Sequence, residues 1–204
     1  MPVTADWVRV ALADLSRRAG QDSRLLLSSM SARSVAAFPE LFSEGYTALV
    51  ERYGAVASEI GAQQFSEWAN ELGIRAQVVT AAGVDPVRAA ARSRWALTQS
   101  NQAGNLSVLV DELVRQPYRS TIADSAVSSG AGWARVPRSA HPCAFCSMLA
   151  SRGAVYHSAS SAGGFGGKKY HGDCGCEPVL VRGPEDFPAG YNPDDLYDAY
   201  RLAR

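Results

Sequence analysis

The feature that most constrains this chain is the grouping of its cysteines. All four cysteines of the 204-residue sequence fall within the 34 positions that end at Cys176. They form two groups, Cys143-Ala-Phe-Cys146 and His171-Gly-Asp-Cys174-Gly-Cys176, with a Gly- and Ser-rich stretch between them. Two such groups predict a small module that closes around one shared metal ion.

The spacing within each group suits a tetrahedral ion. Two cysteines separated by two residues direct their sulfurs to one side of a tight turn, as Cys143 and Cys146 would. In an extended segment, residues two apart project to the same face, so Cys174 and Cys176 can converge on the same ion. His171 is a competing ligand, because a turn would bring its imidazole beside Cys174. We therefore predict a structural Zn²⁺ bound by the first pair and by two of the other three residues.

Three other readings of the cysteines stay open: disulfides, a redox pair and unligated thiols. Four cysteines allow three disulfide pairings. The N-terminus carries no secretion signal, however, and a reducing compartment disfavours disulfides. A thioredoxin-like pair would begin a helix after a strand, whereas residues 137–142 have the composition of a loop. A deaminase-like catalytic zinc would need a His-x-Glu sequence ahead of the paired cysteines, and the sequence has none.

The chain ahead of the cysteines has the periodicity of packed helices. Apolar residues at helical spacing predict a first helix from about residue 5. Pro39 suits the first position of a long helix through residue 72, and Asp85 with Pro86 opens another through residue 97. These apolar stripes are typical of the core of a helical bundle.

The next helix and the boundary after it are predicted from caps and breakers. We expect Asn105 to cap this helix and Pro117 to stop it, with a shorter helix over residues 122–127. The sequence Ser-Ser-Gly-Ala-Gly at 128–132 then marks the clearest boundary. We therefore divide the chain into a helical region, residues 1–128, and a small Cys/His metal-binding module, residues 133–204.

The second part of the chain combines short extended pieces with short helices. Extended pieces are expected over 133–136, 154–156 and 178–181, and Asn192 caps a C-terminal helix. Gly153 can end a short helix over 147–152 in a left-handed conformation. The predicted fold class is mainly α: an N-terminal helical region, then a small α+β zinc-knuckle-like module and a C-terminal helix.

Charge and hydropathy exclude several classes of partner. The formal net charge is zero, so no overall field attracts the chain to DNA or to an anionic membrane. No apolar run reaches the roughly 18 residues of a membrane span, and we expect action from the cytosol without a membrane partner. The stretch 162–169 lacks the first Gly and the final Ser or Thr of a phosphate-binding loop. Lys168 and Lys169 form only a small basic patch, and a DNA-binding role based on it would weaken steeply with salt.

The sequence contains no complete catalytic set. Of its three histidines, His141 and His171 adjoin the predicted ligands, which leaves His157. There is no nucleophile elbow and no Glu-x-Glu pair. The alternative to a structural role is a zinc-containing nuclease or an ADP-ribosyltransferase-like effector, in which His157, Asp173 or Glu177 would act beside the metal. We expect a protein without enzymatic activity and without a small-molecule substrate.

Residues 136–181 resemble the C-terminal segment of Mu F-like minor capsid proteins of tailed bacteriophages, particularly of the actinobacteriophage type. The resemblance rests on CAFCSMLASRGAVY and, after the Gly-rich gap, KYHGDCGCEPV. It implies helices before a small module, with Arg152, Gly153 and Tyr156 as scaffold of the motif. The functional positions that it implies are Cys143, Cys146, His171, Cys174 and Cys176.

The same resemblance implies a role in head morphogenesis. We expect a structural minor head protein associated with the portal or the inner capsid, acting in head assembly or in genome packaging and ejection. Its partners would be portal and capsid proteins, with weak contact to packaged DNA. It would lie in the capsid interior of the virion, and in the host cytoplasm during assembly. Larger relatives carry an appended protease or toxin domain. This chain departs from them in having none, so we expect no activity of that kind.

Overall fold

The computed structural model describes residues 6–138, 142–154 and 174–203. Helices dominate this part of the chain, and one two-stranded sheet joins them near the C-terminus. The elements are α1 (Asp6–Ser29), α2 (Ala32–Ala37), α3 (Pro39–Leu72), α4 (Pro86–Leu97), α5 (Gln102–Ser128), β1 (Gly132–Pro137), α6 (Ala144–Ala150), β2 (Cys176–Val181), the 3₁₀ turn η1 (Pro184–Asp186) and α7 (Pro193–Leu202). The predicted fold class is confirmed.

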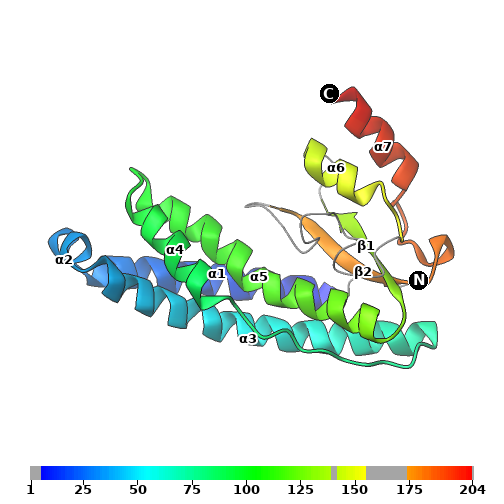
Figure 1. Ribbon diagram of the computed structural model, residues 1–204, viewed down its shortest axis with the longest axis horizontal. Coiled ribbons are helices and arrows are strands. Elements are labelled where there is room, and N and C mark those ends of the chain that lie inside the picture. Colours follow the sequence, from blue (N-terminus) through cyan, green and yellow to red (C-terminus); the bar gives the residue numbers. More distant parts are fainter. Residues whose placement is uncertain (1–5, 139–141, 155–173, 204) are drawn as a thin grey trace.

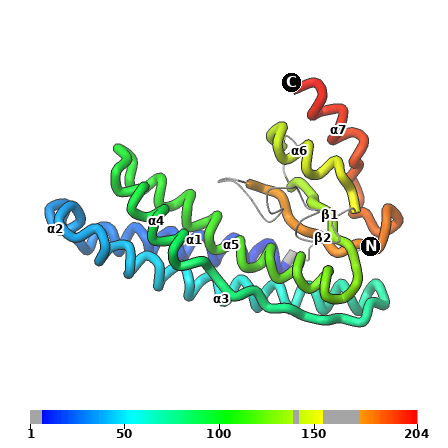
Figure 2. Tube along the Cα trace, in the orientation of Figure 1, coloured from blue at the N-terminus to red at the C-terminus, as the bar shows by residue number. Residues whose placement is uncertain are grey.

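The helices α1, α3, α4 and α5 form an elongated body, and the sheet, α6 and α7 gather at one end of it (Figures 1 and 2). Helix α1 runs away from the sheet end and α3 returns to it. Residues 74–84 then run back along the body, and after α4 the long helix α5 returns to the sheet. No helix in the described ranges is long and apolar enough to cross a membrane.

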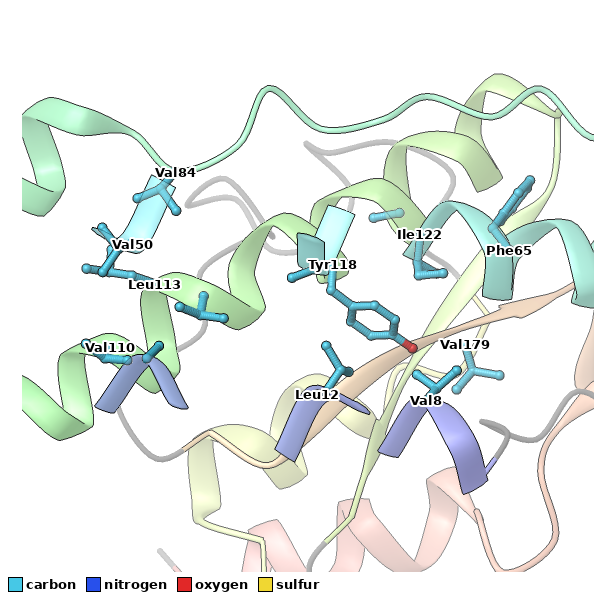
Figure 3. Packing of buried hydrophobic residues seen from close by; sticks show 14 of the residues in the cluster. Val8, Leu12, Val50, Phe65, Val84, Val110, Leu113, Tyr118, Ile122 and Val179 are labelled. Atoms are coloured by element: carbon cyan, nitrogen blue, oxygen red, sulfur yellow. The ribbon is translucent and has the colours of Figure 1, made fainter. Parts of the chain in front are cut away.

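One hydrophobic core is continuous from the helical body into the sheet. Figure 3 shows Tyr118 of α5 directed between residues of α1 and of β2. Members of the cluster on the helices include Val8, Leu12, Val50, Phe65, Val110, Leu113, Tyr118 and Ile122, and members on the strands include Trp133, Val179, Leu180 and Val181. The division into 1–128 and 133–204 stays a prediction.

Helix α5 differs from its prediction at both ends. Asn101, rather than Asn105, caps it, because the Asn101 side chain accepts the backbone N–H of Gly104 at 3.1 Å. The helix also continues through Pro117 to Ser128, so the predicted stop and the separate helix over 122–127 were wrong. Pro117 is buried against α3, where a Cβ on Gly54 would lie 3.2 Å from its ring. Tertiary packing therefore offsets the hydrogen bond that proline removes.

The predicted N-caps of α4 and α7 are confirmed. Asp85 accepts the backbone N–H groups of Val87 and Arg88 at the start of α4. Asn192 accepts the N–H of Asp194 at the start of α7. The short helix α2, which Ser31 caps, has no counterpart in the sequence predictions.

The two strands pair antiparallel, with Trp133 opposite Leu180 and Pro137 opposite Cys176. The extended pieces predicted over 133–136 and 178–181 lie in β1 and β2. In the third piece, Ala154 lies in a turn, and residues 155–156 lie outside the described ranges. Helix α6 begins three residues before the predicted start because Cys143 is its N-cap, and it ends at Ala150 with Ser151 as its C-cap, two residues before the predicted end. Gly153 has the expected left-handed backbone, with φ of 65°.

Candidate metal centre

Three of the four cysteines meet at the sheet end of the molecule. Their Sγ atoms all lie within 4.8 Å of one another, and those of Cys146 and Cys174 are 3.5 Å apart. Cys146 comes from α6, Cys174 precedes β2, and Cys176 is the first residue of β2. All three side chains are buried. We call these three residues the sulfur cluster.

Local structure explains how the sulfur cluster forms. Cys143 has an extended backbone, and its Sγ accepts the backbone N–H of Cys146 at 3.4 Å. This cap fixes the turn that directs Cys146 inward. On the other side, Arg138 N–H donates to the carbonyl of Gly175 at 3.2 Å, which extends the β1–β2 pairing past Cys176. Residues two apart in an extended strand share a face, so Cys174 and Cys176 both reach Cys146.

The dimensions of the sulfur cluster fit a thiophilic metal ion. Sulfurs at about 2.3 Å from a tetrahedral zinc lie about 3.8 Å from one another. This value lies between the 3.5 Å that separates the sulfurs of Cys146 and Cys174 and the 4.8 Å within which all three sulfurs lie. The three residues are therefore close enough to bind a metal ion. No disulfide joins any of the four cysteines, all of which lie in the described ranges.

The other two predicted ligands have different outcomes. Cys143 is exposed at the start of α6, and its Sγ is not one of the three atoms that lie within 4.8 Å. His171 lies outside the described residues, as do His157, Asp173 and Tyr156. The structure thus brings Cys146 of the first group together with Cys174 and Cys176 of the second group. The identity of a fourth ligand stays a prediction.

The three sulfurs strongly influence one another's ionisation. The hydrogen bond from the Cys146 thiol, followed by one from the Cys176 thiol, lowers the pKa of Cys174 far below its ordinary value, and the charge of Arg119 lowers it further. The bond that Cys146 donates to Cys174 raises the pKa of Cys146. The arrangement therefore favours a thiolate at Cys174, which is the form of cysteine that binds metals.

Two buried arginines that the sequence motifs did not identify contact Cys174. Arg119 of α5 donates from Nη2 to the carbonyl oxygen of Cys174 at 2.5 Å. Arg135 of β1 places its Nη2 3.7 Å from Cys174 Sγ. Arg135 is fully buried and Arg119 is 3% exposed. The signal in the sequence was their position: Arg119 lies one residue after buried Tyr118, and Arg135 lies among the apolar residues of β1.

Glu177, which the enzyme alternative places beside the metal, has a different partner. It follows Cys176 in β2, so its side chain projects to the opposite face of the strand. There its Oε2 lies 2.7 Å from Nε of Arg138, and the carboxylate is buried. This ion pair accounts for the burial of Glu177.

Comparison with known proteins gives a family match. The profile of the family described as VG15 protein matches residues 2–203, nearly the whole chain. No curated protein and no solved structure matches the chain significantly.

Proposed function

Because the chain belongs to the VG15 family of phage-encoded proteins, we propose that it is a structural minor head protein, associated with the portal or the inner capsid. A zinc ion in the sulfur cluster would stabilise its C-terminal part. The proposal includes no enzymatic step.

The observation that carries this proposal is the burial of three converging thiol groups. A catalytic zinc keeps one position open to solvent and substrate, whereas a structural zinc is enclosed by protein ligands. Cys146, Cys174 and Cys176 are each at most 6% exposed. Arg119 and Arg135, two charged side chains that contact Cys174, stabilise thiolates but do not act as general bases.

The chain's own residues explain what a bound zinc would do. Cys146 would connect α6 to the start of β2, and Arg119 connects α5 to the backbone at Cys174. When bound, zinc supplies a cross-link between segments that are distant in the sequence, and its binding free energy adds to folding stability. The result would be a rigid end on the helical body, suited to contacts with other head proteins.

The Mu F-like resemblance of residues 136–181 supports the finer assignment to the capsid interior. Neither the zero net charge nor the described helices favour strong binding to DNA or insertion into a membrane. We therefore propose portal and capsid proteins as the main partners, with only weak contact to packaged DNA. During assembly the protein would be present in the host cytoplasm.

Two measurements test the proposal. We expect the purified protein to contain stoichiometric zinc by elemental analysis, and we expect mass spectrometry to detect it in purified virions and proheads. A phage that lacks the gene should assemble defective heads, and supplying the gene in trans should restore them. Zinc-free protein together with virions that lack this chain would contradict the proposal.

A further inference from the structure

Residues 74–84 form an extended segment that runs along the body between α3 and α4 (Figure 1). Its last residue, Val84, belongs to the same core cluster as Val50 and Leu113 (Figure 3). Three alternate backbone N–H groups, those of Gln77, Val79 and Ala81, donate to hydroxyl groups of α5 and of its C-cap residue Ser129. The pairs are Gln77 with Ser129 at 2.7 Å, Val79 with Ser125 at 2.9 Å, and Ala81 with Thr121 at 3.0 Å.

The spacing of the donors along the extended segment matches the spacing of the hydroxyl groups along the helix. Two residues of extended chain span about 6.6 Å, and four residues of helix span about 6 Å. The carbonyl groups of two of these residues also face the body. Val79 accepts from Ser125 Oγ at 3.4 Å, and Ala81 accepts from Ser58 Oγ of α3 at 3.3 Å. Hydroxyl side chains thus replace a neighbouring strand on the inner side of the segment.

The outer side of the segment has no such partners within residues 6–138, 142–154 and 174–203. In an extended backbone, the N–H and C=O groups of successive residues point in opposite directions. Ala76, Val78, Thr80 and Ala82 therefore direct these groups away from α5. Among the described residues, none of the four makes a backbone hydrogen bond. We call these four N–H and C=O pairs the outer edge.

The outer edge also lacks the features that normally protect a strand edge. Proteins blunt such edges with lysine, proline, bulges or a covering element. Residues 76–84 contain no charged residue and no proline. Val78 and Val79 are 42% and 39% exposed, and with Thr80 they form a β-branched centre. An edge with these properties pairs readily with another extended chain.

We propose that a second copy of this chain covers the outer edge, through antiparallel pairing of the two segments about a twofold axis at Val79. In this register Val78 lies opposite Thr80, and Ala76 lies opposite Ala82. All four outer-edge residues of each copy then exchange hydrogen bonds in narrow pairs. Gly83, with φ of 89°, ends the extended stretch just beyond this region.

Charges at the two ends of the segment favour a second copy over an unrelated strand. Arg75 precedes the uncharged stretch and Asp85 follows it. Antiparallel pairing brings Arg75 of one copy to the end where Asp85 of the other copy lies. Arg75 has no ion pair among the described residues. Asp85 caps α4 through Oδ1 alone, so its Oδ2 can accept a further hydrogen bond.

Analytical ultracentrifugation of the full-length protein tests the proposal. We expect a concentration-dependent dimer. Thr80→Pro removes an outer N–H and leaves the bonds to α5 in place, so this variant should be monomeric and still folded. Thr80→Lys should also be monomeric, because it places like charges near each other across the axis. Val56→Lys, which changes an exposed apolar residue of α3, is the matched control and should still dimerise.

Amide exchange by NMR gives a second readout. In the dimer, the N–H groups of Val78, Thr80 and Ala82 should exchange slowly, and dilution should make them fast while Val79 and Ala81 stay protected. A wild-type monomer at every concentration would overturn the proposal, as would a dimer that persists in both Thr80 variants. Outer-edge protection that appears only in phage particles would assign the edge to a different protein and would overturn it too. These results do not depend on zinc content or on virion location.

Discussion

At the scale of single residues, the most informative side chains are the two buried arginines beside Cys174. A buried guanidinium is costly unless an opposite charge offsets it. Arg135 is fully buried, and its Nη2 lies 3.7 Å from Cys174 Sγ. This contact favours a negative charge on Cys174.

Arg135 should therefore influence metal affinity without being a ligand. Replacing a group that contacts a ligand typically lowers metal affinity about 10- to 100-fold. We expect Arg135→Met to lower zinc affinity within this range, measured by competition with a chromophoric chelator. Arg135→Lys, which keeps the charge, should lose less, and Arg52→Met on the exposed face of α3 should lose nothing. Equal affinities in wild type and Arg135→Met would show that the arginine has no such role.

Asp186 provides a prediction about pH. Its carboxylate accepts from the side chain of Arg182 at 2.8 Å and from the Arg182 backbone N–H at 2.9 Å, and the side-chain bond is the main cause of its lowered pKa. A lowered folded-state pKa stabilises the protein above the pKa of the unfolded chain, and this stabilisation disappears as the pH falls through the folded value.

We expect Asp186→Asn to lower the free energy of unfolding by about 1 kcal/mol at neutral pH, since solvent screens the half-exposed Arg182. The difference in the free energy of unfolding between wild type and variant should shrink as the pH falls below about 4, where the unfolded aspartate becomes protonated. Urea unfolding of both proteins at a series of pH values measures this difference in free energy. A difference that stays constant down to strongly acidic pH would contradict the assignment.

At the scale of elements, apolar spacing predicted α1, α3 and α4 well, since each has one stripe that must be buried. Tertiary packing decided the features that were missed. Pro117 sits inside α5 because its ring packs against Gly54, a contact 63 positions away in the sequence. The outer edge of residues 74–84 was also missed, because it depends on hydroxyl groups that only the folded α5 aligns.

The close approach of α3 and α5 gives a prediction with a matched control. A Cβ on Gly61 would lie 3.0 Å from the carbonyl oxygen of Tyr118 and 3.1 Å from Cβ of Thr121. A Cβ on Gly45, in the same helix, would meet Leu26 at 3.4 Å, an ordinary contact. Alanine improves helix propensity at either position by about 1 kcal/mol, but overpacking costs about 1–3 kcal/mol.

We therefore expect Gly61→Ala to destabilise the protein and Gly45→Ala to stabilise it slightly, both measured as changes in the free energy of unfolding in urea. If both substitutions stabilised the protein equally, the two helices would not be in the close contact described.

At the scale of the whole molecule, the sulfur cluster joins segments that the sequence keeps far apart. The spacing of the cysteines predicted that Cys143 and Cys146 share one ion with two of His171, Cys174 and Cys176. The structure brings Cys146 together with Cys174 and Cys176, and Cys143 is not in this group. The surroundings of the cluster were not predictable in the same way. Arg119 comes from the helical body and Arg135 from the opposite strand, and their positions follow from the continuous core that connects the body to the sheet.

The central claim is that the sulfur cluster binds zinc, and X-ray absorption spectroscopy at the zinc edge of the purified protein tests it most directly. We expect a first shell with at least three sulfurs at about 2.3 Å. A fourth sulfur would identify Cys143, and one nitrogen at about 2.0 Å would identify His171. A shell of oxygen and nitrogen alone, or protein that holds no zinc when purified without chelators, would contradict the account.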